Sequence, residues 1–488
     1  VGRNVVRVGV AMAVAFGALA AGAGYWGVVK APELSRSPND PLVIAASRTV
    51  PRGRIVDRDG TILARNAREA NGDLYRVYAS AAISHVVGYA SRRFGTAGLE
   101  RAYDAELAGL AAEPVADAFR KFGADPYDPQ QLTLSLSLDL QRAAVAALGA
   151  RRGAIVMLDP TTGEILALAS TPTYDPSAVA HPRTSVATFE KLRTDRAQPL
   201  LPRATLGRYV PGSVFKIVTA IAGLGSGAIE PTTTYPEQPG AEEDGLLVSG
   251  FRVRDGHHPS TGATALGLVG ATEASCNIWY ALTGLRTGGE DLAGYAGRMG
   301  FGEPLDFDLP TAVSQVTNGR GSEPGGFLDE VELANASYGQ AETFVTPLQM
   351  ALVAATVAND GVLMRPRLVT AMSGKRGVRA FGPEQLGAVI SPADAAAIQS
   401  AMQRAVEGGL GRQFTTGASV PGVTTAGKSG TAELGGMGEP HSWFIGFAPV
   451  DEPRIAIAVL VERAGRGAEV ASPIAGDLME RYLRSLAP

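Results

Sequence analysis

The hydrophobic pattern of this 488-residue chain begins with one long apolar run near its N-terminus. Residues Val8–Val29 carry no formal charge over 22 positions, and the run is bounded by Arg3 and Arg7 before it and by Lys30 after it. About 20 apolar residues span the hydrocarbon core of a bilayer as a helix. The pattern therefore predicts a membrane-spanning helix at residues 8–29.

Flanking charges give this predicted helix an orientation. Arginines in a short leading tail favour the cytoplasmic side, so residues 1–7 are expected inside and the rest of the chain outside the cytoplasm. A cleaved signal peptide is the alternative, because small residues between Ala18 and Gly24 resemble a cleavage site. The run is longer than a usual signal-peptide core, which favours a retained anchor and a single-pass protein of the plasma membrane.

Shorter apolar segments bounded by turn residues predict strands. Residues Arg52–Ala64 indicate two short strands joined by an Asp-Gly turn. Two longer hairpins are expected far apart in the chain, one from Gly153–Leu158 and Glu164–Ala169, the other from Ser442–Ala448 and Arg454–Val461.

Helical patterns fill much of the space between these hairpins. Asp139 is expected to cap an Ala-rich helix that ends near Gly149, and a last helix is expected at about 473–486. The middle, roughly 213–410, is predicted to be mostly helical, with loops at 225–270 and 302–330. Strand pairs at both ends of a domain with helices between them imply an α+β fold whose sheet joins sequence-distant strands.

The chain therefore divides into two parts outside the predicted membrane helix. Residues 31–131 carry more charge and several turn signals, and they are interpreted as a structural pedestal because no nucleophile is paired with a base there. The Arg and Asp cluster around Arg52–Asp59 is expected to be a solvated ion-pair network. Residues 132–488 are the predicted catalytic domain.

Composition excludes several classes of function. A net charge of −4 and a pI of about 5.9 give no basic surface for nucleic acid. Cys276 is the one cysteine, so an internal disulfide is excluded. The five histidines show no metal-ligand spacing and no phosphate-binding loop is found, so neither a metal nor an organic cofactor is expected.

Candidate chemistry centres on the segment Tyr209–Ala220. A Pro-Gly turn leads directly into an apolar helix, and Ser213 and Lys216 are three residues apart, which places them on one helical face. A hydroxyl beside an amine that can accept its proton is an activated nucleophile. The N–H of Ser213 at the helix start is free to face a developing oxyanion.

Lysine usage strengthens this interpretation. The chain has only six lysines among its 44 basic residues, so a lysine inside an apolar helix is unusual here. Lysine loses its proton when it is buried or placed beside another cation, whereas arginine does not. A surface serine with a nearby solvated lysine is the ordinary alternative for an isolated S-x-x-K pattern.

Two further motifs favour the catalytic interpretation. Ser275 and Asn277 form an S-x-N motif in which the hydroxyl can relay protons and the amide can bind a lysine and a substrate amide. Residues Lys428–Thr431 precede the second hairpin and should form the strand at the edge of the site. Lys428 is expected to bind a substrate carboxylate and to lower the pKa of Lys216. Gly430 is expected to admit the substrate backbone, and the N–H of Thr431 to supply a second oxyanion donor.

The order S-x-x-K, S-x-N and K-S-G resembles the penicillin-recognising serine acyltransferases. The resemblance to class B penicillin-binding proteins extends from the apolar N-terminal run to the last helix. It includes the R-G-x-I-x-D-R-x-G-x-x-L-A pattern of Arg52–Ala64, Gly339-Gln340 and Thr346–Ala351. The segment His441–Pro449 is most similar to the actinobacterial penicillin-binding protein A group.

This resemblance implies a fold and a reaction. The fold is an antiparallel sheet covered by helices, with an all-helical subdomain, a small pedestal or dimerisation-like domain and one membrane helix. The reaction is D-Ala-D-Ala transpeptidation of peptidoglycan stem peptides through an acyl-enzyme on Ser213, with β-lactams as inhibitors. It also implies a separate membrane glycosyltransferase as partner, and a role in cell division or shape.

The sequence departs from the family pattern at one motif position, and three alternative functions are to be weighed against transpeptidation. Ser429 stands where threonine is usual, which keeps the hydroxyl and is expected to alter β-lactam sensitivity. A D-Ala-D-Ala carboxypeptidase or β-lactamase would share acylation but deliver water. A β-lactam sensor or a non-catalytic scaffold of the division or elongation machinery would bind without turnover.

Overall fold

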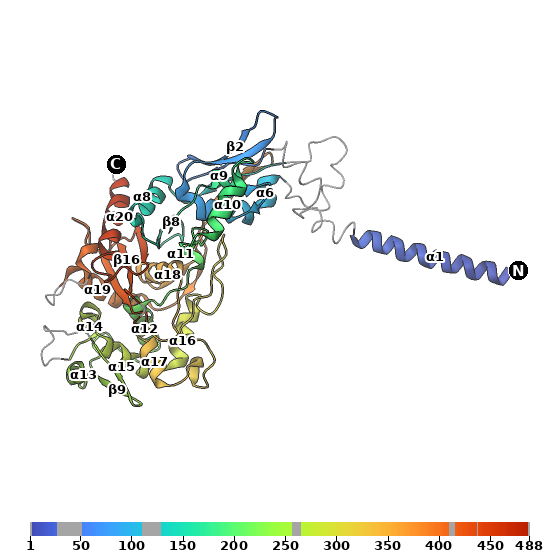
Figure 1. The fold of residues 1–488 in the computed structure, drawn as a ribbon. Coiled ribbons are helices and arrows are strands. Elements are labelled where there is room, and N and C mark those ends of the chain that lie inside the picture. Colours follow the sequence, from blue (N-terminus) through green and yellow to red (C-terminus); the bar gives the residue numbers. More distant parts are fainter. Residues whose placement is uncertain are drawn as a thin grey trace.

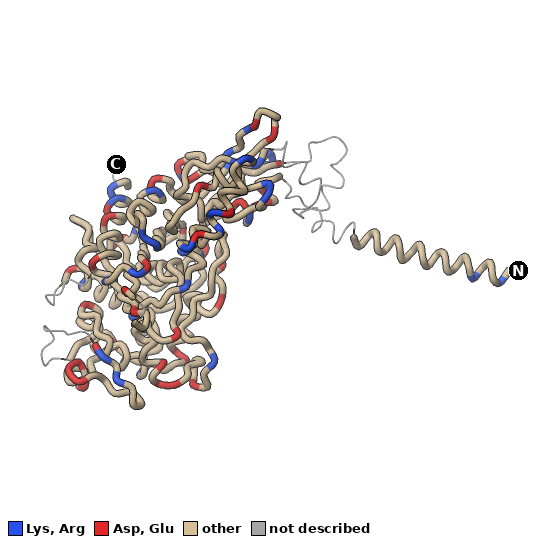
Figure 2. Tube along the Cα trace, viewed as in Figure 1, with Lys and Arg blue, Asp and Glu red and all other residues tan. Residues whose placement is uncertain are grey.

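The computed structural model describes residues 2–26, 51–109, 128–255, 265–408, 415–436 and 438–486. Its first helix, α1 (Gly2–Gly24), is long and apolar enough to cross a membrane, and none of its described residues is buried. Figure 2 shows the positive charges of α1, Arg3 and Arg7, near its N-terminal end. The helix starts before the predicted segment, whose last residues, 27–29, lie outside the described part.

The two predicted hairpins are confirmed, and they meet in one antiparallel sheet. The strand order is β15-β16-β17-β7-β8, and every neighbouring pair is antiparallel. Strand β17 joins the hairpins by pairing with β7, with Ala458 opposite Val156. The strands are β7 (Gly153–Leu158), β8 (Ile165–Thr171), β15 (Ala426–Ala432), β16 (His441–Ala448) and β17 (Ile455–Val461).

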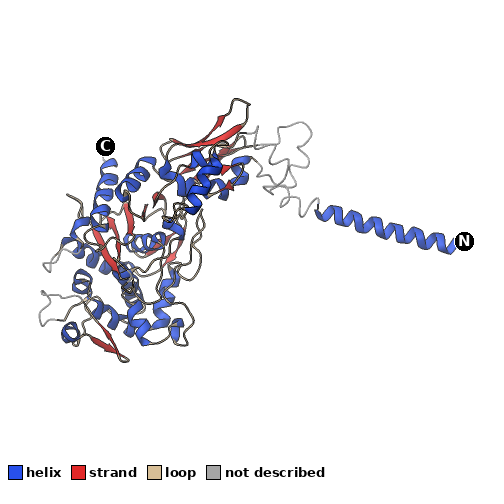
Figure 3. Ribbon diagram, viewed as in Figure 1, coloured by secondary structure: helices blue, strands red, loops and turns tan. Residues whose placement is uncertain are grey.

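Helices cover both faces of this sheet because its strands are apolar on both sides. Ile155 and Met157 lie in the core formed with α8 (Leu138–Leu148) and α20 (Ala471–Ser485). Ala154 and Val156, which alternate with them, lie in the other core with α18 (Pro347–Ala358). Figure 3 shows the strands of this sheet between helices.

A group of helices continues from the edge of the sheet that β15 forms (Figure 1). Its central helix is α12, which packs against α15, α16 and α19, while α19 also packs against β15. The expected antiparallel sheet with an all-helical subdomain is therefore confirmed. The members are α12 (Lys216–Gly225), α14 (Leu268–Ala274), α15 (Asn277–Thr287), α16 (Gly289–Arg298), α17 (Glu330–Ala336) and α19 (Pro392–Glu407).

A second sheet joins the N-terminal part to later segments. Its order is β13-β12-β6-β1-β2-β3, and β1 and β6 are parallel. The predicted boundary between the pedestal and the catalytic domain, at 131/132, falls within β6. Strands β12 and β13 lie within residues 213–410, which were predicted to be mostly helical. The strands are β1 (Ile55–Val56), β2 (Ile62–Arg68), β3 (Leu74–Tyr78), β6 (Gln131–Leu134), β12 (Val369–Gly374) and β13 (Gly377–Ala380).

Short elements complete the described fold. Three two-stranded antiparallel sheets are formed by β4 (Ala90–Ser91) and β5 (Gly95–Thr96), β9 (Leu246–Val248) and β10 (Phe251–Val253), and β11 (Val362–Met364) and β14 (Gln385–Ala388). The remaining α-helices are α4 (Ser84–Val87), α5 (Gly98–Ala102), α6 (Asp104–Ala108), α9 (Pro176–Ala180), α10 (Ser185–Thr194), α11 (Arg203–Leu206) and α13 (Gln238–Asp244).

The predicted cap of α8 was wrong. The helix begins at Leu138, so Asp139 lies inside it, and the N-cap residue Ser137 makes no side-chain cap bond. The carboxylate of Asp57 provides the cap instead, because it accepts a hydrogen bond from the N–H of Leu138 at 3.1 Å. It also accepts one from the N–H of Thr61 at 2.7 Å. Asp57 is 2% exposed, so this part of the Arg/Asp cluster is buried rather than solvated.

Arg52 likewise belongs to a buried network. Its guanidinium pairs at 2.9 Å with Glu100, which also pairs with Arg76 at 2.7 Å, and the Glu100 side chain is fully buried. Burial disfavours the ionised carboxylate, but the two guanidinium groups outweigh it and hold the pKa of Glu100 below its usual value. The prediction of a solvated network is therefore wrong here too. The sequence alone does not show that Glu100 forms buried ion pairs with Arg52 and Arg76.

Candidate active site

The candidate nucleophile lies on a tight turn between two segments. Ser213 is in the 3-10 turn η3 (Gly212–Phe215), which continues into α12. Gly212 has φ +57°, and a Cβ there would lie 2.7 Å from the carbonyl oxygen of Thr431. Glycine is therefore needed at this position both for the backbone conformation and for the close approach of β15. The N–H of Gly212 donates to Gly339 O at 2.9 Å, which fixes the turn from the other side.

Lys216 is the first residue of α12, and its side chain is fully buried. Its Nζ donates to three oxygens: Ser275 O at 2.5 Å, Ser275 Oγ at 3.2 Å and Asn277 Oδ1 at 2.8 Å. Ser213 itself is partly exposed, and among the described residues no hydrogen bond joins its hydroxyl to Lys216. In unliganded sites such catalytic contacts are often long and shorten with substrate bound.

The S-x-N motif occupies the connection between α14 and α15. Ser275 has φ +56°, which is uncommon for a residue other than glycine and is a form of backbone strain found at functional sites. Cys276 caps α15, because its Sγ accepts the N–H of Trp279 at 3.3 Å. The Asn277 amide also donates to Arg254 O at 3.2 Å, so both ends of this amide are occupied.

Lys428 brings the third motif to the same point. It lies on β15, its side chain is 1% exposed, and its Nζ donates to Ser275 Oγ at 2.9 Å and to Ser429 O at 2.8 Å. The Ser275 hydroxyl therefore lies between the amines of Lys216 and Lys428. Three segments that are far apart in the chain thus form one hydrogen-bonded cluster.

Glycine and threonine on β15 face the nucleophile turn. A Cβ at Gly430 would lie 3.0 Å from Pro211 O and 3.0 Å from Val214 Cγ1, so this glycine makes room for the turn itself. In an antiparallel strand the N–H and C=O of one residue point to the same side. Since the C=O of Thr431 faces Gly212, its N–H faces the turn that carries Ser213 as well.

Burial and mutual repulsion set the protonation of the two lysines. Burial lowers the pKa of Lys216 to about 8, although Asp255 opposes this shift. Burial, followed by repulsion from Lys216, holds the pKa of Lys428 well below its usual value. Lys428 was expected to lower the pKa of Lys216 with its positive charge; the structure shows the repulsion acting on Lys428, whose pKa is lowered by burial first and by the Lys216 amine second.

Two residues near the cluster were missed by the sequence analysis. Asp255 accepts the N–H of Ile278 at 3.2 Å, and its charge acts on both lysines. Thr415 is buried and its Oγ1 lies 3.3 Å from Ser429 Oγ. Neither has a motif or a spacing that could have identified it, because both reach the site through tertiary contacts.

One group of side chains in the described part has the geometry of metal ligands. Single ligand atoms of Glu242, Asp255 and Cys276 all lie within 4.8 Å of one another. The Cys276 thiol donates to Glu242 Oε1 at 3.3 Å, and burial raises its pKa well above the usual value. Because the same sulfur accepts the N–H of Trp279, these residues support the start of α15.

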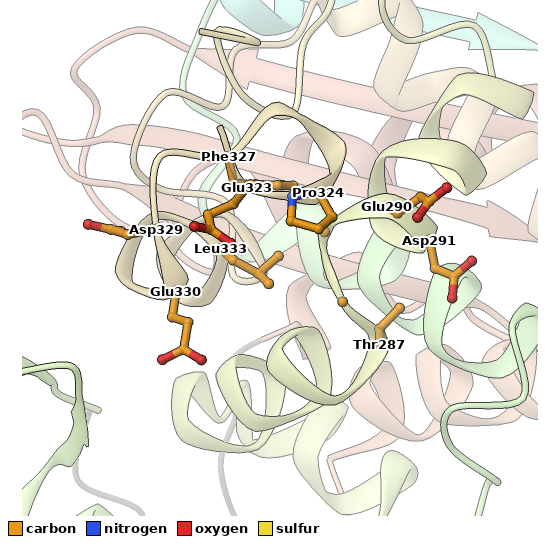
Figure 4. A pocket seen from close by; sticks show the side chains of 11 residues that line it. Thr287, Glu290, Asp291, Glu323, Pro324, Phe327, Asp329, Glu330 and Leu333 are labelled. Carbon is orange, nitrogen blue, oxygen red and sulfur yellow. The ribbon is translucent and has the colours of Figure 1, made fainter. Parts of the chain in front are cut away.

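A cavity of about 380 Å³ lies elsewhere, between α16 and α17 (Figure 4). Acidic side chains surround its rim, and the apolar side chains of Phe327 and Leu333 line it. None of the eight candidate site residues lines this cavity. The acidic residues are Glu290, Asp291, Glu323, Asp329 and Glu330.

Family comparisons cover most of the chain. The penicillin binding protein transpeptidase domain matches residues 153–480, and the penicillin binding protein A dimerisation domain matches residues 52–125. The peptidoglycan D,D-transpeptidase PbpA of Mycolicibacterium smegmatis is 36% identical, over 98% of this chain and 98% of the relative. PbpA of Mycobacterium tuberculosis is 32% identical, over 94% of each.

Solved structures of a penicillin-binding protein also superpose on most of this chain. Penicillin-binding protein A of M. tuberculosis in its ceftriaxone acyl-enzyme complex superposes with a TM-score of 0.78 at 31% identity, covering 90% of this chain and 99% of that one. Its penicillin G acyl-enzyme complex gives a TM-score of 0.77 at 31% identity, covering 89% of this chain and 99% of that one.

Proposed function

Because the chain belongs to the penicillin-binding protein transpeptidase family, we propose that it cross-links peptidoglycan through an acyl-enzyme on Ser213. The substrates are stem peptides that end in D-Ala-D-Ala. One observation carries the assignment of the site: the Ser275 hydroxyl lies 3.2 Å from the amine of Lys216 and 2.9 Å from that of Lys428, so the three motifs form one cluster beside Ser213.

Acylation begins with removal of the Ser213 proton. Lys216 acts as the base in its neutral form, which its lowered pKa of about 8 makes accessible near neutral pH. The Oγ of Ser213 then attacks the carbonyl carbon of the penultimate D-Ala. The charge that develops on the carbonyl oxygen is stabilised by the N–H groups of Ser213 and Thr431.

Ser275 passes the proton on to the leaving group. Its hydroxyl accepts a hydrogen bond from Lys428 and is within reach of Lys216, so a proton taken by Lys216 can be delivered to the amine of the departing D-Ala. The C–N bond breaks, free D-Ala leaves, and the stem peptide stays on Ser213 as an ester. The amine of a neighbouring stem peptide then attacks this ester and restores the serine.

Substrate recognition is assigned to β15. We assign Ser429, Gly430 and Lys428 to binding of the terminal carboxylate and the peptide backbone, and Asn277 to orienting Lys216, whose amine donates to its Oδ1. A β-lactam presents a similar carboxylate and carbonyl. It acylates Ser213 in the same way, but its ring fragment stays attached and blocks the second step.

Helix α1 is proposed as a single membrane anchor with its N-terminus inside the cytoplasm. Its length, its apolar composition and the arginines near its N-terminal end support this orientation. The catalytic part then lies outside the cytoplasm, where peptidoglycan is assembled. Class B penicillin-binding proteins cross-link peptidoglycan but do not polymerise its glycan strands. A separate membrane glycosyltransferase is therefore proposed to supply these strands.

The test uses the full chain in detergent, incubated with penicillin G and followed by intact mass. One drug-sized increment is expected on the wild type and none on Ser213→Ala. Persistence of the adduct for hours supports a transpeptidase, whereas rapid return to the free mass indicates a β-lactamase. Lack of any adduct would refute acylation of Ser213, and a stable adduct on Ser213→Ala would refute the choice of nucleophile.

A further inference from the structure

The segment that carries Ser213 is connected to the end of the central strand, β17, through one carboxylate, Glu462. This residue follows β17 directly. Its Oε1 accepts hydrogen bonds from the hydroxyl of Tyr209 at 2.8 Å and from the Nε of Arg203 at 2.7 Å, and its Oε2 forms an ion pair with the Nε of Arg152 at 2.9 Å. The side chain of Glu462 is 10% exposed and that of Arg203 is fully buried, so the bond between them is shielded from solvent, whereas Arg152 is 38% exposed.

Tyr209 is held through its backbone as well as its hydroxyl. Its N–H donates to Val345 O and its C=O accepts from the N–H of Val345, both at 2.9 Å. Its ring makes edge-to-face contacts with His441 and Trp443, at centroid distances of 5.5 Å and 6.3 Å. The indole of Trp443 in turn donates to Val210 O at 3.0 Å. The chain is therefore fixed at the two residues that open the turn leading to Ser213.

The surrounding atoms leave the Tyr209 ring little freedom. A Cβ at Gly207 would lie 2.4 Å from Cε2 of the ring and 2.7 Å from its hydroxyl oxygen. Burial, and then the Glu462 carboxylate, raise the pKa of Tyr209, so its hydroxyl stays protonated and remains a donor at neutral pH. The ring and its hydroxyl thus have one defined position, set by the carboxylate.

We propose that Tyr209 and Glu462 are positioning residues for the acylation of Ser213. They do not touch the reacting atoms. The Tyr209–Glu462 bond holds the start of the turn against the sheet, and β15, on the other side of the turn, supplies Lys428 and Thr431. The proposal rests on the proposed function, because it concerns the same acylation step.

This role follows from the geometry that nucleophilic attack requires. The serine oxygen must meet the carbonyl carbon at close range while the oxyanion faces the N–H groups of Ser213 and Thr431. Because only three residues lie between Tyr209 and Ser213, a small displacement of the tyrosine moves the nucleophile relative to β15. Binding of the β-lactam carboxylate by β15 does not depend on the tyrosine, so the acylation rate and the binding step should respond differently.

The test compares Tyr209→Phe with a matched control, Tyr174→Phe. Both tyrosines are buried and each loses one hydroxyl bond, since Tyr174 donates to Ser84 O at 3.0 Å. Phenylalanine at 209 keeps the ring contacts and leaves the two arginine pairs of Glu462 intact, so both variants should fold. The full chain in detergent is mixed with a chromogenic cephalosporin, and the concentration dependence of the rate gives the acylation rate constant and the dissociation constant separately.

The expected result for Tyr209→Phe is an acylation rate constant about tenfold lower with a dissociation constant changed by no more than about twofold. Tyr174→Phe should match the wild type in both constants, while the two variants lose similar amounts of thermal stability. An unchanged acylation rate in Tyr209→Phe, or an equal loss in Tyr174→Phe, would overturn the proposal. Failure of the wild type to acylate would refute the proposed function instead.

Discussion

The Nζ atom of Lys428 lies 2.9 Å from the Oγ atom of Ser275, although the two residues are 153 positions apart. This contact connects β15 to the start of α15. It also places one hydroxyl between two buried amines, since Lys216 lies 3.2 Å from the same oxygen. A proton can therefore move between the lysines through Ser275 without passing through solvent.

Ser275→Ala is expected to slow acylation about 100-fold, because it removes a group assigned to proton transfer. Lys216 keeps its bonds to Ser275 O and Asn277, so the stability of the fold should change by about 1 kcal/mol or less. The acylation rate with a fluorescent penicillin and the thermal midpoint are the measurements. Ser226→Ala, at the far end of α12, is the control, because its hydroxyl bonds only locally to Gly223 and Ala228. Equal rates for the two variants would contradict the relay.

The pH dependence of acylation should report Lys216. Its pKa is lowered to about 8 by burial, and only the neutral amine accepts the serine proton. The second-order rate constant should therefore rise with pH up to about 8 and then level off. It is measured with a β-lactam that carries no ionisable amine, between pH 6 and pH 10. A flat profile across that range would exclude Lys216 as the base.

Lys216→Arg separates the charge of this residue from its basicity. Arginine keeps the positive charge but cannot accept the proton, so acylation should fall by about 1,000-fold. Lys191→Arg is the control, because Lys191 is exposed on α10 and should tolerate the change. Intact-mass labelling after a short exposure to penicillin measures the effect. Near-normal labelling of a folded Lys216→Arg protein would refute the general-base role.

Local patterns explain why much of the fold could be predicted from the sequence. The hairpin of β7 and β8 is specified by apolar strands around an Asp-Pro-Thr-Thr-Gly turn. Such signals lie within about ten residues of each other. Joining the two hairpins through β17 and β7 gives four strands, and β15, expected at the edge of the site, pairs with β16 as the fifth.

Contacts between distant side chains could not be predicted in the same way. The cap of α8 comes from Asp57, which is 81 residues away from Leu138, and Thr415 reaches Ser429 through a buried hydroxyl contact. Asp139 has the local sequence pattern of an N-cap residue, but it lies inside α8 and does not cap the helix. A carboxylate or hydroxyl has the same appearance in the sequence whether it is solvated or buried, so its partner becomes known only when the tertiary structure is known.

The buried carboxylate of Glu100 gives the last prediction. It is fully buried between Arg76 and Arg52, so Glu100→Gln takes the counter-charge from the buried Arg76, while Arg52 keeps its pair with Asp104 at 2.8 Å. Loss of one partner from a buried ion pair costs about 3–5 kcal/mol, and a large fall in the thermal midpoint is expected at pH 7. The control is Glu190→Gln, because Glu190 pairs with Arg193 at the exposed surface of α10 and should contribute little.

The difference between wild type and Glu100→Gln should also depend on pH in one direction. The folded-state pKa of Glu100 is depressed, so its stabilisation is complete above the unfolded-state pKa of about 4.3 and is lost as the pH falls through the lower folded-state value. The two thermal midpoints should therefore converge in acid while Glu190→Gln stays close to the wild type throughout. A constant difference between wild type and Glu100→Gln down to pH 3 would mean that the variant is destabilised by altered packing rather than by loss of the charge.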